Sequence, residues 1–560
     1  MNRSVPHGAA IDDGFRFVAL GGSDEIGMNL YLYGVDGHWL MVDCGVAFGD
    51  ERTPGIDVLM PAVEFIAERR HQLVGLVLTH GHEDHFGAIQ YLWPQLRCPV
   101  YATPFTAAFL RLKLHDSVFD DPVPIHEVPL GGRLTLGPFD VTFVEMTHSI
   151  PEPNCLILRT RYGTVVHTGD WKRDPKPMIG RTVDEETLRR VGGEGVLALV
   201  SDSTNALEEG HSGSESDARD ALVDVIARQP NRVAVTCFST NVARILSVAE
   251  AAAAADRQCA LVGRSLWRVH EAARSTGYMK PPAPFLSEQE AAYLPRDRVV
   301  LVCTGSQGES TAALTRIAND THPHIVLEPD DTVIFSAREI PGNEKAIARV
   351  QNALVRQGIR IVTAADAPVH VSGHPAREEL TALYQWVRPG IVIPVHGDPR
   401  RQRAQAALAE ACQVPQTLIP EDGAVIQLAP GPAAIVDHVP VGRIARDGHR
   451  LVRLDDAIMR QRHRLTHNGA LTVTLVMAPG GALLADPQIV AFGLYDADAN
   501  DPALREIGRD IRDAVEDLPR ARRRDDEAVR AAATQAARRR MRTDLGKKPL
   551  MEIKVLRIGD

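Results

Sequence analysis

Short apolar runs alternate with polar turns over the first 200 residues. Runs this short, bounded by turn-forming residues, are typical of β-strands. The predicted strands are Trp39–Cys44, Leu73–Thr79, Val141–Met146, Thr164–Thr168 and Val196–Val200. Polar residues stand at or just after the ends of these runs: Asp43, His80, His148, Asp170 and Asp202. Because α/β enzymes carry their chemistry at strand ends and in the loops that follow, the pattern predicts one site built from several strands.

Between residues 205 and 370, strand-like runs alternate with longer helix-like segments. In chain order these are the strand Val233–Phe238, the helix Val242–Asp256, the strands Ala260–Val262, Val299–Cys303 and Thr332–Phe335, and the helix Glu344–Gln357. Such alternation favours a parallel sheet with crossover helices. We therefore expect a second α/β domain inserted into the first.

A further series follows, in which histidines again stand at strand ends. It comprises the strand Pro368–Val371, the helix Ala376–Val387, the strand Ile391–Val395 and the helix Arg401–Cys412. This segment is predicted to return to the first domain. After the Pro/Gly-rich Pro430–Pro432, the last hundred residues predict a small α+β domain. The expected divisions are 1–204 and 369–445 for the two parts of the first domain, 205–368 for the insertion, and 446–560 for a linker and C-terminal domain.

The C-terminal region contains an arginine-rich segment. Arg520–Arg542 predicts a helix, and the tail from Met551 alternates like a strand. A basic helix can bind RNA, but Asp525, Asp526 and Glu527 interrupt this one. A solvated helix face is the alternative interpretation, and both stay open.

Composition narrows the class of protein. The net charge of −10 argues against a nucleic-acid binder that relies on overall charge, although a local basic groove remains compatible with it. No apolar stretch approaches the roughly 20 residues that span a bilayer, and no apolar core follows the first residues, so we expect neither a membrane span nor a signal peptide. Seven scattered cysteines without a CxxC pair indicate a reducing cytoplasm and exclude a cysteine zinc site.

Potential metal ligands are concentrated in the run His80-Gly-His82-Glu-Asp84-His85, directly after a predicted strand. A tight turn can direct His80 and His82 to one ion, and Asp84 and His85 to another. Gly81 is expected to give this turn conformational freedom. Imidazole together with carboxylate suits zinc, and manganese is also compatible.

This run resembles the HxHxDH signature of the metallo-β-lactamase superfamily, and further elements of that pattern follow in order. Asp43 follows a strand, His148 opens His-Ser-Ile-Pro, and Asp170 ends Thr-Gly-Asp. The resemblance implies an αββα sandwich with two metals that share Asp170. The first would be held by His80, His82, His148 and Asp170, and the second by Asp84, His85, Asp170 and one later histidine. Asp43 would orient ligands.

The inserted segment resembles a β-CASP domain, because Ser201–Asn205, His370–His374 and Pro394–Gly397 match the motifs of that group. The resemblance implies that His396 is the remaining ligand of the second metal. It also implies that His374, near Asp202, is the general acid. A parallel α/β β-CASP domain would then be inserted into the sandwich, followed by the small α+β C-terminal domain.

Four further strings resemble the ribonuclease J family: Gly21–Gly27, Thr304–Glu309, Phe335–Ala337 and Ile340–Glu344. The resemblance implies a two-metal ribonuclease that hydrolyses single-stranded RNA, with 5′-to-3′ exonuclease and endonuclease action in RNA maturation and decay. The alternatives are a β-CASP nuclease acting on DNA and a non-catalytic RNA-binding scaffold. Hydrolases of thioesters or lactones in this superfamily lack the inserted domain, so the sequence favours them less than a nuclease.

The same resemblance sets expectations for cofactors and partners. We expect two divalent ions, zinc first, with Mn²⁺ or Mg²⁺ as alternatives. Two loops offer donors for an RNA 5′-phosphate: Ser372, Gly373 and His374, and Gly305, Ser306 and Gln307. The C-terminal domain is predicted to hold a homodimer or homotetramer together, and RNA-decay proteins are possible partners.

Overall fold

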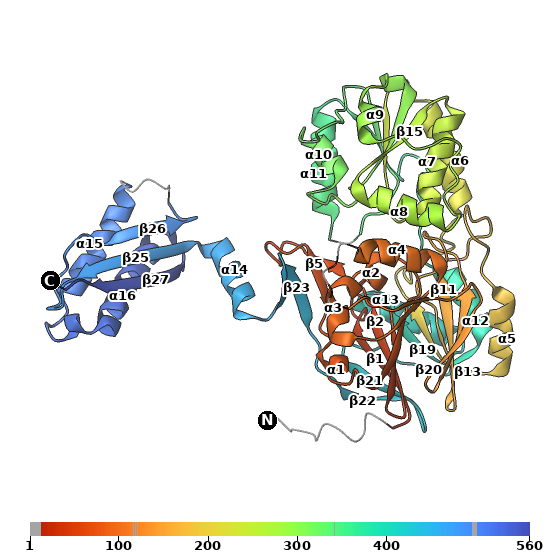
Figure 1. Cartoon of the computed structure of the whole chain (residues 1–560), viewed down its shortest axis with the longest axis horizontal. Helices are drawn as coiled ribbons and strands as arrows, with labels where there is room; N and C mark the ends of the chain where they lie inside the picture. Colours follow the sequence, from red (N-terminus) through yellow and green to blue (C-terminus); the bar gives the residue numbers. More distant parts are fainter. Residues whose placement is uncertain are drawn as a thin grey trace. The chain divides into compact units, whose positions relative to one another are not determined.

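The computed structural model describes residues 13–115, 117, 119, 121–340, 342–495 and 501–559 (Figure 1). The chain forms two compact units. The first comprises the residues up to Ala47 and Leu59–Gly442, and the second comprises Phe48–Val58 and Arg443–Asp560. The short strands β4 (Ala47–Phe48) and β5 (Val58–Pro61) lie at the two ends of Phe48–Val58.

The first unit is built on two sheets, each of which contains both parallel and antiparallel strand pairs. The first has the order β22 (Ala434–His438), β21 (Ala424–Ala429), β1 (Phe15–Gly21), β2 (Leu30–Val35), β3 (His38–Val42), β6 (Leu73–Val77), β7 (Val100–Ala102), β8 (Ile125–Glu127). The second has the order β20 (Gln416–Thr417), β19 (Pro389–Val395), β13 (Val196–Asp202), β12 (Gly163–His167), β11 (Asn154–Thr160), β10 (Phe139–Glu145), β9 (Arg133–Leu136).

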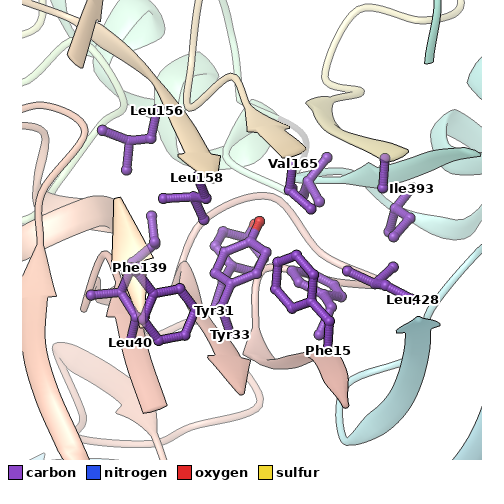
Figure 2. Close-up of a cluster of buried hydrophobic side chains, with 14 of the residues drawn as sticks. Phe15, Tyr31, Tyr33, Leu40, Phe139, Leu156, Leu158, Val165, Ile393 and Leu428 are labelled. Carbon is purple, nitrogen blue, oxygen red and sulfur yellow. The ribbon is translucent and has the colours of Figure 1, made fainter. Parts of the chain in front are cut away.

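The main core lies between these sheets (Figure 2). Phe15, Tyr31 and Leu40 of the first sheet meet Leu158 and Val165 of the second, and all five are fully or almost fully buried. Strands with one face in the core alternate buried and less buried side chains, as the pattern Phe139–Glu145 does. Apolar alternation thus sets which side of each strand faces the partner sheet.

Helices cover the outer faces of both sheets, which gives the predicted αββα sandwich. On the first sheet the helices are α1 (Glu64–Ala67), α2 (Glu83–Phe86), α3 (Ile89–Leu96) and α4 (Pro104–Leu114). On the second they are α5 (Glu185–Glu194), α12 (Arg377–Val387) and α13 (Pro399–Ala411), whose apolar side chains form a second core with that sheet. Trp171 and Trp386 lie within this second core.

The inserted segment forms a five-stranded sheet in which every pairing is parallel. Its order is β15 (Gln258–Val262), β16 (Val299–Cys303), β14 (Val233–Thr236), β17 (Thr332–Phe335), β18 (Arg360–Val362). The accompanying helices are α6 (Glu215–Ala227), α7 (Val242–Ala254), α8 (Arg264–Ser275), α9 (Glu288–Ala292), α10 (Ala313–Ala318) and α11 (Glu344–Arg356). The expected parallel α/β insertion is therefore confirmed.

The chain then returns to the sandwich. β19 pairs in parallel with β13, and β21 pairs antiparallel with β1. The predicted strand Pro368–Val371 is wrong, because these residues form a loop. The carbonyl of Val369 accepts hydrogen bonds from the side chains of Arg244 and Ser336, at 3.0 and 2.6 Å, in place of a strand partner.

The second unit begins with the hairpin β23 (Arg443–Asp447) and β24 (Arg450–Arg453), followed by α14 (Ala457–Asn468). A three-stranded sheet follows, in the order β26 (Gln488–Phe492), β25 (Ala470–Met477), β27 (Leu550–Arg557), and α15 (Pro502–Glu516) and α16 (Asp526–Leu545) pack on one face of it (Figure 1). The predicted single helix Arg520–Arg542 is divided, because Asp525 caps α16 after a short 3₁₀ turn at Arg522–Arg524. No helix among the described residues has the length and apolar content to cross a membrane.

Candidate active site

Five strand ends of the sandwich bring the predicted residues together. The loop after β6 and the short helix α2 carry His80, His82, Asp84 and His85. His148 lies between β10 and β11, Asp170 follows β12, and His396 follows β19. Asp43 follows β3. The structure therefore places residues from five distant stretches of sequence within a few ångströms of each other.

The first group of potential ligands contains His80, His82, His148 and Asp170. Nδ1 of His82 lies 3.0 Å from Nε2 of His80 and 3.0 Å from Nε2 of His148. Oδ2 of Asp170 lies 3.9 Å from Nε2 of His80 and 3.7 Å from Nε2 of His148. Three imidazole nitrogens and one carboxylate oxygen thus face a common centre.

The second group contains Asp84, His85, His396 and the same Asp170. Nε2 of His85 lies 3.2 Å from Oδ1 of Asp170, and Nε2 of His396 lies 3.5 Å from its Oδ2. Oδ2 of Asp84 lies 3.8 Å from Nε2 of His85 and 3.7 Å from Nε2 of His396. The two oxygens of Asp170 thus serve both groups.

In the first group of potential ligands, the protonation of the side chains fits cation binding. Burial lowers the pKa of His80 and His148 well below the usual value, and that of His82 to about 4. Neutral imidazoles each keep one nitrogen lone pair, and lone pairs facing each other at 3.0 Å repel unless a proton or a cation lies between them. Burial opposes ionisation of Asp170, but His396, His85 and His374 outweigh it and hold its pKa well below the usual range. Nitrogen and oxygen donors in this arrangement suit zinc.

Asp43 belongs to neither group of potential ligands but contacts His85 of the second group. Its carboxylate accepts hydrogen bonds from the backbone N–H and the hydroxyl of Thr79, both at 2.8 Å. Its Oδ2 is also 2.7 Å from Nδ1 of His85, so Nε2 of that ring faces Asp170. Asp43 is fully buried, and burial raises the pKa of its carboxyl group while His85 opposes the rise. This contact fixes the orientation of the His85 ring.

Left-handed backbone conformations are concentrated around the site. Asp43 and His396 have φ angles of 60° and 54°, and Met28 and Glu152 have φ angles of 52° and 58°. Such conformations are costly for residues other than glycine and persist where surrounding contacts impose them. The backbone N–H of His396 donates to the carbonyl of Gly22 at 2.6 Å, which is one such contact.

Sequence reasoning missed two residues of the site. Oδ1 of Asn29 lies 2.9 Å from Nδ1 of His396, and Nδ2 of Asn29 lies 3.0 Å from Nε2 of His85. Asn29 therefore links the two histidines of the second group, and its place directly before a strand start was the available signal. Gly45 was also missed. A Cβ on Gly45 would lie 1.6 Å from the carbonyl oxygen of Asp84, so the ligand loop packs directly on this glycine.

The expected role of Gly81 is not supported. It does not appear among the residues with positive φ, and a Cβ there would make ordinary contacts of 3.5 Å with Ile150 and Phe109. Close approach is required instead at Gly373, where a Cβ would lie 2.7 Å from Cε1 of His148. The carbonyl of Gly373 is 2.5 Å from Nδ1 of His148 and so orients that ring.

His374 and Asp202 form a close pair at the edge of the cluster. Nδ1 of His374 lies 2.8 Å from Oδ2 of Asp202 and 3.8 Å from Oδ2 of Asp170. Burial lowers the pKa of His374, but Asp202 and Asp170 outweigh it and raise this pKa to about 9. These residues, with Asp170 and His396, also satisfy the geometry of a third potential ligand group.

The two loops proposed for a 5′-phosphate are connected through Asn205 and Arg338. Nδ2 of Asn205 donates to the hydroxyl of Ser372 at 2.7 Å and to the carbonyl of His374 at 3.0 Å. Nη1 of Arg338 donates to Oδ1 of Asn205 at 2.8 Å, and the Arg338 carbonyl accepts from Gln307. The amide of Gln307 is thus engaged within the inserted domain, and Ser306 is buried.

Fold and site together define a metallo-β-lactamase-superfamily hydrolase that carries a β-CASP domain. Family models agree with this class. The metallo-beta-lactamase superfamily model matches residues 25–236, and the ribonuclease J beta-CASP domain model matches residues 230–354. A Zn-dependent metallo-hydrolase RNA specificity domain matches residues 359–415, and a ribonuclease J C-terminal domain matches 457–558.

Curated relatives agree with these matches. The chain is 45% identical to a ribonuclease J of Sinorhizobium meliloti over 557 residues, covering 99% of both chains. It is 38% identical to a ribonuclease J of Mycobacterium tuberculosis over 517 residues, covering 91% of this chain and 92% of the relative. The chain belongs to the ribonuclease J family. A solved structure of a protein of unknown function from Enterococcus faecalis shares the fold, with a TM-score of 0.52 and 16% identity over 74% of this chain and 99% of that one.

These findings confirm the predicted family, fold class and enzyme class, a metal-dependent ribonuclease. The Zn-dependent family model and the His/Asp groups agree with metal binding.

Proposed function

We propose that this chain hydrolyses phosphodiester bonds of single-stranded RNA with two divalent cations per chain. The observation that carries the proposal is the position of Asp170, whose two carboxylate oxygens face both groups of potential ligands. In two-metal sites a bridging carboxylate holds the cations close enough to act on one phosphate. Zinc suits the donors best, with Mn²⁺ or Mg²⁺ as alternatives.

The ligands are assigned by these groups. His80, His82, His148 and Asp170 hold the first cation. Asp84, His85, Asp170 and His396 hold the second. Asp43 orients His85 and binds no cation. Bound in this way, the cations would supply a nucleophile at neutral pH and would neutralise charge on the phosphate oxygens.

His374 acts as the general acid. The leaving 3′-oxygen needs a proton, and an imidazole held by a carboxylate can deliver it. Asp202 holds His374 through Nδ1, at 2.8 Å, which fixes the ring beside Asp170 without making it a ligand. The product of this step keeps its 5′-phosphate.

Exonuclease action from the 5′-end accompanies endonuclease action. Ser372, Gly373 and His374 are assigned to the terminal phosphate, together with Gly305, Ser306 and Gln307, whose loop is linked to them through Arg338 and Asn205. The chain would then serve RNA maturation and decay in the cytoplasm, as a homodimer or homotetramer held by its C-terminal domain, together with other proteins of RNA decay.

The test uses 5′-labelled and 3′-labelled single-stranded RNA and DNA of one sequence, with and without chelator. The expected result is chelator-sensitive cleavage of RNA that releases products with 5′-phosphates. His82→Ala removes a proposed ligand, while His38→Ala, at an exposed histidine in β3, is the matched control. Cleavage of DNA at the rate of RNA, or full activity of His82→Ala, would contradict the proposal.

A further inference from the structure

The helix α16 carries a concentration of positive charge that the proposed active site does not use. The chain has a net charge of −10, yet residues 520–548, which include α16, contain eleven Lys or Arg and four Asp or Glu. Five of these arginines and three of these acids lie within α16 itself. Sequence alone left this segment open between an RNA-binding helix and a solvated face, because three of the acids interrupt the basic run.

The two faces of α16 differ sharply in chemistry. The inner face is buried in the core of the second unit, against α15 and the sheet, and contributes Val529, Ala533, Ala536, Ala537 and Met541. The outer face exposes Arg530, Arg538, Arg539 and Arg542. Its other side chains are small or polar, including Thr534, Gln535 and Thr543. No large apolar side chain is exposed on α16, all of whose residues the structure describes.

Three of the four acidic residues of the segment are engaged elsewhere, and the fourth, Glu527, is exposed in the first turn of α16. Asp525 caps the start of α16, where its carboxylate accepts from the N–H of Glu527 at 3.0 Å. Asp526 binds Arg557 at 2.8 Å. Asp544 lies 3.9 Å from Arg540, which also binds Asp510 at 2.8 Å. Of the acids in this segment only Glu527 remains to offset the four arginines, so the outer face keeps a net positive charge.

Within the described part of the chain, no ion pair involves Arg530, Arg538, Arg539 or Arg542. Some exposed arginines of other helices, by contrast, are paired. Arg189, Arg190, Arg228 and Arg274 each lie within 2.6 to 3.8 Å of a carboxylate on the same helix. The outer face of α16 is thus distinct from the mixed-charge surface that is usual for solvated helices.

We propose that these four arginines, which are not part of the active site, bind the phosphate backbone of single-stranded RNA, an inference that rests on RNA being the substrate. At 1.5 Å per residue, Arg530 and Arg542 are about 18 Å apart along the helix, enough to contact several phosphates. Guanidinium groups present planar pairs of donors that match phosphate oxygens. Because the face has no aromatic or apolar anchor, it suits a polyanion of any sequence better than a protein surface.

The test compares full-length wild type with the variant Arg530→Gln/Arg538→Gln/Arg539→Gln/Arg542→Gln. Gln matches Arg closely in helix propensity, so α16 is expected to persist, and circular dichroism checks this. The control, Arg189→Gln/Arg190→Gln/Arg228→Gln/Arg274→Gln, removes the same charge from exposed but paired arginines. Affinity for a 30-nucleotide RNA is measured by anisotropy with chelator over a series of salt concentrations.

Each phosphate contact contributes about 0.7 to the slope of log affinity against log salt for a single strand, so the four-arginine variant should lose about 2.8. The control should keep the wild-type slope. An unchanged slope in the α16 variant, or equal losses in both variants, would overturn the proposal. So would unchanged RNA affinity combined with lost binding of polyglutamate, which would assign the face to an acidic protein.

Cleavage separates this proposal from the proposed function. The α16 variant should keep wild-type kcat/KM on a five-nucleotide RNA and lose it on long RNA. A chain that binds RNA through α16 but cleaves none would refute the proposed function and leave this inference standing. Normal cleavage of long RNA by the α16 variant, with an unchanged salt slope, would refute this inference and leave the proposed function standing.

Discussion

Oδ2 of Asp202 lies 2.8 Å from Nδ1 of His374, although 172 positions separate the two residues in the chain. Asp202 ends β13, just before the inserted domain, and His374 follows that domain in the loop before α12. The contact therefore joins the two segments that flank the insertion. The candidate acid is held only when both segments are in place, which ties the chemistry to the fold of the whole first unit.

Replacing His374 with Ala should lower the cleavage rate by about 10² to 10⁴, the usual loss for a general acid. Metal content should stay at the wild-type level, because His374 is held by Asp202 and not assigned as a ligand. Asp202→Asn should give a smaller loss, since it keeps an acceptor for the ring. Loss of a cation on His374→Ala would show that this residue is a ligand, as the third potential group allows.

Asp43→Asn should weaken metal binding while leaving every assigned ligand in place. Its carboxylate fixes the His85 ring at 2.7 Å, and losses of such orienting contacts typically cost about 10- to 100-fold in metal affinity. The measurement is a competitive zinc titration with a fluorescent chelator. Asp36→Asn is the control, because Asp36 also has a left-handed backbone but lies at the turn between β2 and β3. Equal affinities for wild type and Asp43→Asn would remove the orienting role.

RNA with a 5′-monophosphate should be degraded faster than the same RNA with a 5′-triphosphate. The Ser372 hydroxyl, held by Asn205 at 2.7 Å, is assigned to a pocket for one phosphate, and two further phosphates would not fit a closed pocket. Ser372→Ala should reduce this preference without affecting internal cleavage. Equal rates on both ends in the wild type would rule out such a pocket and leave internal cleavage as the starting step.

The open face of the C-terminal sheet should hold subunits together. Val490, Phe492 and Leu556 are exposed by 51, 64 and 52%, on the side away from α15 and α16. Deleting residues from about 460 onward, or the variant Phe492→Ser/Leu556→Ser, should lower the mass measured by light scattering and keep the bound metal. Tyr293→Ser, at a residue 90% exposed in the inserted domain, is the control. An unchanged mass in both test variants would refute the assignment.

Several strands of the first unit followed closely from apolar periodicity, although others, such as β1, β2 and β11, were not predicted. Val299–Cys303 and Thr332–Phe335 are strands with the predicted bounds, because fully buried parallel strands are continuous apolar runs. The prediction failed at Pro368–Val371, where side chains of Arg244 and Ser336 take the backbone carbonyl of Val369. Contacts of this kind join residues more than thirty positions apart, and periodicity does not contain them.

The run from His80 to His85 was recognisable as a candidate metal site from its spacing, whereas His148, Asp170 and His396 were assigned only through the family resemblance. Asn29 and Gly45 carried no such spacing, and their roles arise from tertiary contacts with His396 and Asp84. The roles of Asp525 and Asp526 were equally unpredictable from the sequence, because Asp525 caps α16 and Asp526 pairs with the distant Arg557. The sequence thus indicated functional residues that their type and spacing identify. It did not indicate residues whose roles depend on tertiary contacts.

The central claim is that Asp170 joins two cation sites, and metal stoichiometry tests it most directly. Wild-type protein should contain about two divalent ions per chain when it is purified without chelator. The metal content is measured by inductively coupled plasma mass spectrometry. Asp84→Ala should lose the second ion and all cleavage, and His38→Ala should match the wild type. One ion per chain in active wild-type protein, or normal turnover by Asp84→Ala, would contradict the account.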